Sequence, residues 1–182
     1  NKFGSLAVEA EYKTQASVLN SKWVELNIIN QVAKVYGYYT YLIEEEKNLK
    51  MRESTLKDLE VLEKSNIAIG KGVKETLLPI QQELRNTQSY IKVNNLNQQL
   101  AENNLNLISG LKNPERLKTL LSQAKSRPNT AIFNKIKIPN QVSSDVVHNR
   151  PDVEYYLMLI KAQESRLKAL KADFYPQFSI TG

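Results

Sequence analysis

The sequence contains no cysteine and only one histidine among its 182 residues. Without cysteine, a disulfide framework, a thiolate metal site and a thiol nucleophile are all excluded. The single histidine, His148, gives little basis for a histidine metal site or a catalytic triad. We therefore predict no catalytic, cofactor-binding or metal-binding residues, and we expect that the chain is not an enzyme.

Glycine and proline are scarce, at six residues each, and no apolar run reaches 18 residues. The second absence excludes a transmembrane helix. Hydrophobic residues make up 41% of the chain and charged residues 24%, a balance that favours long helices over a compact β-rich domain. No signal peptide is visible, and both ends of the sequence are expected to be cut from something longer.

The net charge of +6 is spread along the chain and not gathered in one place. No arginine-rich stripe alternates with aromatic residues, so we predict no nucleic-acid partner. The charges are better explained as the solvated surface of helices.

Residues 5–66 contain no proline and repeat apolar or small side chains in steps of three and four. This spacing predicts one helix of about 60 residues, roughly 90 Å long at about 1.5 Å per residue. A rod of this length needs partners along its whole length. The spaced residues are Tyr12, Ala16, Leu19, Trp23, Leu26, Ile29, Val32, Tyr36, Tyr39, Ile43, Leu49, Leu56, Leu59 and Leu62.

Gly70 and Gly72 break this pattern and predict a reversal of the chain. A second helix is expected to follow, with Pro79 in its first turns, and to end near Ile108. Together the segments predict an antiparallel coiled-coil hairpin over residues 5–110, with its tip near 68–76. The second helix has its own grid of spaced positions, several of them polar: Leu77, Ile80, Leu84, Thr87, Ile91, Asn94, Gln98, Ala101, Leu105 and Ile108.

Residues 111–148 have a mixed pattern, with a short helix near Leu117, a turn at 127–129 and an extended piece at 135–139. A further helix is predicted over 149–175, with Asn149 as its N-cap. Alternating polar and apolar residues after Pro176 are typical of a strand. The predicted fold class is therefore all-α dominated: a long hairpin, a small mixed region and short strand-like ends at 1–4 and 176–182.

Three segments carry short motifs: His148-Asn149-Arg150-Pro151-Asp152-Val153, followed by Ala172-Asp173-Phe174-Tyr175-Pro176 and the closing Thr181-Gly182; Lys2-Phe3-Gly4; and Gly72-Val73-Lys74-Glu75. They resemble motifs of the outer membrane efflux protein family, the TolC-like outer membrane factors. The first resembles the family's return from a helix into a β-barrel strand, the second its step from a strand into a long helix, and the third its hairpin turn.

The resemblance implies a homotrimer that forms a β-barrel in the outer membrane and a helical tunnel in the periplasm. This chain would be the periplasmic part of the first half, with 111–148 as an equatorial region. The implied function is passive conduction of substrates, together with a periplasmic adaptor (a membrane fusion protein) and, indirectly, an inner-membrane transporter. We accordingly expect an outer-membrane location, with no cofactor.

The resemblance and the exposed glycine turn together suggest two sets of site residues. The candidates for adaptor contact at the hairpin tip are Gly70, Lys71, Gly72, Val73, Lys74 and Glu75. The candidates for a membrane interface are Phe3, Phe174, Tyr175 and Phe178. The simpler alternatives are glycines that only permit the turn and aromatic residues that are ordinarily buried.

Other conspicuous residues have simple explanations. Glu44, Glu45 and Glu46 could repel anions, but a solvated helix face is the better interpretation. Trp23 and the tyrosines of 36–41 are expected to pack between helices. The main alternative for the whole chain is a non-conducting coiled-coil scaffold or an adaptor hairpin.

Overall fold

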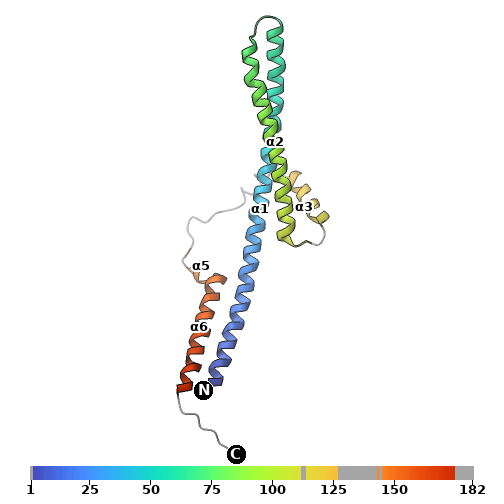
Figure 1. Cartoon of the computed structure of the whole chain (residues 1–182). Coiled ribbons are helices and arrows are strands. Elements are labelled where there is room, and N and C mark those ends of the chain that lie inside the picture. Colours follow the sequence, from blue (N-terminus) through green and yellow to red (C-terminus); the bar gives the residue numbers. More distant parts are fainter. Residues whose placement is uncertain (1, 112–113, 127–142, 144, 175–182) are drawn as a thin grey trace, which may run out of the picture. The chain divides into compact units, whose positions relative to one another are not determined.

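The computed structural model describes residues 2–111, 114–126, 143 and 145–174 (Figure 1). These residues fall into two units, one within 1–29 and 137–182 and the other within 30–136. All regular secondary structure among the described residues is helical, and no strand is present there, which confirms the all-α prediction. The elements are α1 (Lys2–Ala68), α2 (Lys74–Ser109), α3 (Pro114–Ser126), α5 (Asp145–His148), α6 (Pro151–Lys171) and the 3-10 turn η1 (Ala172–Phe174).

Helix α1 is continuous over 67 residues. No proline interrupts it, and Gly37 is accommodated within the helix. A helix this long is stabilised mainly by packing of its side chains against other helices and much less by intrinsic propensity. The predicted helix range of 5–66 agrees with the observed bounds of α1 to within a few residues at each end.

In the unit within 30–136, α1 and α2 lie side by side and antiparallel (Figure 1). Gln81 contacts Glu60 at 2.9 Å, Gln88 contacts Glu53 at 3.1 Å, and the Tyr39 hydroxyl donates to Glu102 at 2.8 Å. Residues later on α2 thus meet residues earlier on α1, which is the antiparallel order. The buried core of this unit consists of Tyr39, Leu42, Ile43, Ala101, Leu105 and, from α3, Leu121.

The buried face of α2 follows the grid predicted from its spacing. Its buried residues are Thr87, Asn94, Gln98, Ala101 and Leu105, and all five are grid positions. Three of them are polar, so the spacing identified the inward face although hydrophobicity alone would not have done so.

In the other unit, the start of α1 lies antiparallel to α6. Trp23 stacks on Tyr155 with ring centroids 6.4 Å apart, and Lys2 pairs with Asp173 at 2.6 Å. The buried hydrophobic residues here are small, namely Ala16, Ala162 and Ala169. Small side chains let two helix backbones approach closely.

Some predicted details differ from the structure. Residues 2–4 were expected to end a strand, yet they are the first residues of α1, where each gains helical hydrogen bonds without needing a neighbouring strand. The N-cap of α6 is Arg150 and not Asn149, because Pro151 occupies the first helical position and disfavours a helical backbone at the residue before it. The predicted turn at 127–129, the extended piece at 135–139 and the strand at 176–182 lie outside the described residues.

Candidate functional site

The turn between α1 and α2 is held by backbone hydrogen bonds to the last residues of α1. The Asn66 carbonyl accepts from the Lys71 amide at 2.8 Å and from the Gly72 amide at 3.1 Å. The Ile67 carbonyl accepts from the Gly70 amide at 3.1 Å. These bonds satisfy carbonyls that the end of a helix leaves without partners, so the turn is a closed cap with a defined shape.

The two glycines of the turn are required for different reasons. Gly70 has φ +75°, a conformation that costs other residues strain energy. A Cβ atom on Gly72 would lie 3.1 Å from the Ile67 nitrogen and 3.2 Å from the Asn66 Cβ, closer than ordinary contact. One glycine therefore supplies a left-handed conformation, and the other allows the chain to pass close to the end of α1.

Helix α2 begins directly after Val73, whose backbone is extended. The Thr76 hydroxyl bonds to the Val73 carbonyl at 2.6 Å and also contacts the Glu63 carboxylate on α1. The side chains of Ile69 and Val73 remain 62% and 59% exposed. The turn therefore presents two apolar side chains on a tightly fixed backbone.

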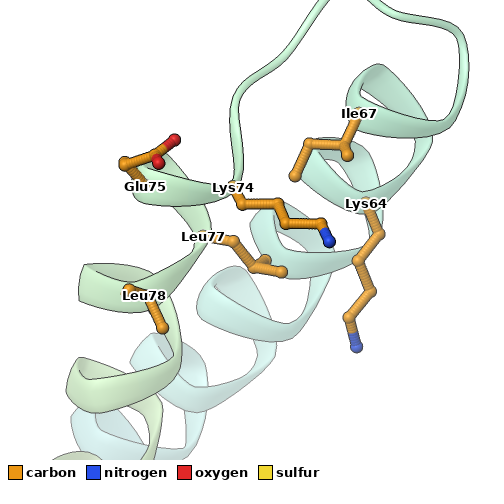
Figure 2. A pocket seen from close by; sticks show the side chains of 6 residues that line it. All are labelled: Lys64, Ile67, Lys74, Glu75, Leu77 and Leu78. Atoms are coloured by element: carbon orange, nitrogen blue, oxygen red, sulfur yellow. The ribbon is translucent and has the colours of Figure 1, made fainter.

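A shallow apolar pocket of about 380 Å³ lies beside this turn, between the end of α1 and the start of α2. Figure 2 shows the Lys74 side chain extending toward α1 near Ile67, while Glu75 lies on the side of α2 that is away from α1. Leu77 also points toward α1. The pocket is lined by Lys64, Ile67, Lys74, Glu75, Leu77 and Leu78. Its apolar floor and lysine rim could accept an apolar side chain from another protein.

The six predicted contact residues thus lie together at one end of the α1–α2 pair. Two of them, Lys74 and Glu75, line the pocket, while Gly70 and Gly72 determine the shape of the turn. The predicted set did not include the other four lining residues, which belong to the helices on either side: Lys64, Ile67, Leu77 and Leu78. Contact with an adaptor stays a prediction.

The known proteins that resemble this chain include an export protein. The "Toxin and drug export protein A" of Aggregatibacter actinomycetemcomitans is 22% identical over 173 residues, which are 95% of this chain and 36% of that protein. A crystal structure of a membrane protein from Pseudomonas aeruginosa matches with a TM-score of 0.80 and 17% identity, over 96% of this chain and 39% of that one. No family model matches the chain.

These findings correct two predictions. The assignment to the outer membrane efflux protein family is withdrawn, because no family model matches and neither similar protein is described as an outer membrane factor. The expected outer-membrane and periplasmic location is withdrawn for the same reason, since the two are described only as an export protein and a membrane protein. The short motifs around Gly72, Arg150 and Pro176 were too brief to carry the assignment.

The chain spans little more than a third of either similar protein. The structural match, at 17% identity, extends to the fold alone. In the described ranges, no helix is both long enough and apolar enough to cross a membrane, and no cluster of residues is suited to hold a metal ion.

Two of the four predicted membrane-interface residues are described. Phe3 is 80% exposed and Phe174 is 89% exposed. Each is next in sequence to one partner of the Lys2–Asp173 ion pair, so both lie where the first residues of α1 meet η1. Tyr175 and Phe178 lie outside the described residues, and a membrane role for any of the four stays a prediction.

A row of polar contacts that was not predicted from the sequence crosses the seam between α1 and α2. Three glutamates spaced seven residues apart on α1 each accept a hydrogen bond from the side-chain amide of a glutamine on α2. Each also forms an ion pair with the lysine four residues later on α1. We call this set the Glu–Gln ladder: Glu46 with Gln98 and Lys50, Glu53 with Gln88 and Lys57, and Glu60 with Gln81 and Lys64. The repeated Glu-x-x-x-Lys pattern at 46–50, 53–57 and 60–64 was the signal that could have revealed it.

The ladder changes the electrostatics of its carboxylates. Hydrogen bonds from Lys57 and then from Gln88 lower the pKa of Glu53, and those from Lys64 and then Gln81 lower the pKa of Glu60. Near the end of the ladder, burial and the adjacent Glu102 carboxylate raise the pKa of Tyr39. Each glutamate charge of the ladder is therefore balanced by the lysine with which it forms an ion pair.

The run of glutamates at 44–46 does not form a single solvated face. Glu44 pairs with Lys47 on its own helix at 2.9 Å, and Glu46 belongs to the ladder. Glu45 is half-buried and makes neither an ion pair nor a hydrogen bond with any described residue. The three neighbours thus have three different environments.

Proposed function

We propose that this chain is a non-catalytic helical segment of an export machine for toxins or drugs. In this proposal, the helices form part of the wall of a conduit, and the α1–α2 turn docks onto an adaptor that links the conduit to an energised transporter. The observation that carries the proposal is the α1–α2 pair itself, with a fixed turn at one end and apolar side chains exposed along its length. The 22% identity to a toxin and drug export protein supports the transport role.

The wall is proposed from the exposure of apolar side chains on both helices. Val61 and Leu62 on α1 are 68% and 57% exposed, and Leu96 and Leu100 on α2 are 55% and 52% exposed. Surfaces of this kind normally contact other protein surfaces. We propose that they pack against further helices of the complete protein, which would form a homotrimer around the conduit.

The docking role is proposed from the turn and its pocket. A rigid, glycine-shaped turn with exposed Ile69 and Val73 offers a partner apolar contact without ordering a flexible loop first, which lowers the entropic cost of binding. The alternative of a non-conducting scaffold would use the same turn. It differs in predicting that export does not depend on this protein.

The chain suits a site-specific crosslinking test because it has no cysteine. Val73→Cys, labelled with a photoreactive maleimide in cells that contain the whole export system, should give a crosslink to the adaptor. Lys118→Cys on α3, an exposed control position, should give none.

An export assay completes the test. Val73→Asp should lower export of a toxic substrate by about fivefold or more, the loss expected when an apolar anchor of an interface is charged. The variant should remain folded, because Val73 is exposed and its backbone shape is set by other residues. Unchanged export together with an absent crosslink would reject the docking role, and export that survives deletion of the gene would reject the transport role.

A further inference from the structure

A second groove, separate from the turn, lies on the α1–α2 pair around residues 38–52 and 90–97, and has a volume of about 430 Å³. Its lining includes three aromatic rings: Tyr38 and Tyr41 from α1, and Tyr90 from α2. The rings of Tyr38 and Tyr41 are stacked with centroids 6.4 Å apart. A groove of this size falls within the range of sites that take small molecules.

The aromatic rings of the groove are accessible. Tyr38, Tyr41 and Tyr90 are 48%, 57% and 58% exposed, so about half of each side chain is open to a ligand and is not buried between α1 and α2. The faces of tyrosine rings attract cations through their quadrupole. Three such rings around one groove therefore favour a positively charged ligand over a neutral or a negative one.

The charged groups of the groove also favour a positively charged ligand. Glu45 lines it and has no ion pair or hydrogen bond with any described residue. Arg52 also lines it, but its guanidinium is paired with Glu83 at 2.5 Å. The uncompensated charge in the groove is thus a carboxylate, while the arginine that could repel a cation is already neutralised.

We propose that this groove binds organic cations that carry aromatic or other apolar groups. The cation would lie against Glu45 and the tyrosine faces, while its apolar groups would cover the exposed side chain of Val93. This inference does not depend on the proposed export role, because it concerns binding to the chain itself.

The sharpest test compares two probes of the same shape and opposite charge. Tetraphenylphosphonium and tetraphenylborate are titrated into the purified full chain by NMR or calorimetry. Tetraphenylphosphonium should bind with a Kd on the order of 0.1–1 mM, as suits an open groove, and tetraphenylborate should bind at least about tenfold more weakly. Equal binding of both probes, or stronger binding of the borate, would overturn the proposal.

Matched variants then locate the site. Glu45→Gln should weaken tetraphenylphosphonium binding about fivefold, the effect of losing one partly screened charge. Glu44→Gln removes the neighbouring charge, which pairs with Lys47 and does not line the groove, and should change nothing. Equal effects of the two variants would show that only general surface charge matters and would reject the site.

A tyrosine pair provides an independent measurement. Tyr41→Phe retains an aromatic face and should keep the affinity, whereas Tyr41→Leu should lower it about threefold. Far-UV circular dichroism checks that each variant keeps the helix content of the parent. Absence of any tetraphenylphosphonium binding, as expected if the groove instead receives another protein helix, would also overturn the proposal.

Discussion

At the scale of single residues, the glycines have opposite roles according to their position. Gly70 has φ +75° and nothing near its missing Cβ, so its cost of substitution is conformational strain alone. Gly37 lies inside α1, and a Cβ there would also meet nothing within 4 Å. The same change to alanine should therefore act in opposite directions at the two sites.

Gly70→Ala should lower the free energy of unfolding by about 1–2 kcal/mol, because the Cβ of alanine is strained in the left-handed backbone conformation of this position. Gly37→Ala should raise it by about 0.5–1 kcal/mol, because alanine is the better helix former. Urea unfolding followed by circular dichroism measures both. A loss of stability in the Gly37 variant would mean that this part of α1 is not a regular helix.

At the scale of elements, the lowered pKa values of the Glu–Gln ladder predict that the pairing of α1 with α2 depends on pH. The pKa values of Glu53 and Glu60 are lower in the folded chain than in the unfolded one, through Lys57 and Lys64 and the glutamine amides. A lowered folded pKa contributes stability above the unfolded value, which is near 4.5, and loses it as the pH falls through the folded value.

We therefore expect the melting temperature to be steady near neutral pH and to fall as the pH drops below about 4.5. Glu53→Gln combined with Glu60→Gln should flatten this dependence between about pH 5 and pH 3. Glu44→Gln, outside the seam, serves as the control and should keep the slope of the parent. Melting curves at half-unit pH steps make the measurement, and an unchanged slope in the double variant would exclude the ladder as the cause.

The elements also show how far the sequence could be interpreted. The three-and-four spacing placed the ends of α1 and α2 within a few residues, and it identified Thr87, Asn94 and Gln98 as inward-facing despite their polarity. The spacing did not show what these residues bond to. The partners of Glu53 and Glu60 lie on the other helix, and only the three-dimensional pairing brings them together.

The candidate site was predictable to the same degree. Glycine spacing located the turn, because a reversal of two helices requires special backbone conformations that few residues allow. The pocket beside it was not predictable, because Lys64, Ile67 and Leu78 belong to helices whose rotation about their axes is set by packing. The groove at Glu45 was missed for a related reason: three adjacent glutamates look alike until their neighbours are known.

At the scale of the whole molecule, the described chain exposes more large apolar side chains than it buries. Among the described residues, ten hydrophobic side chains are buried, whereas many of the largest, such as Leu107 at 81% and Val61 at 68%, face outward. Exposed apolar area of this extent drives association. We expect the purified chain to self-associate as its concentration rises, through surfaces that the assembled protein would cover.

Sedimentation velocity should show species heavier than the 20.8 kDa chain, in a proportion that grows with concentration. Leu62→Lys together with Leu100→Lys should shift the distribution toward the monomer, because both side chains are more than half exposed and a charge there opposes burial in an interface. Leu105→Ala is the contrasting variant: Leu105 is 3% exposed, so its truncation should cost about 2–5 kcal/mol of folding stability without disrupting an outer surface. A parent chain that stays monomeric at every concentration would remove the physical basis for a wall built from these helices, whereas association lost only in the double lysine variant would identify these outward faces as the contact surface.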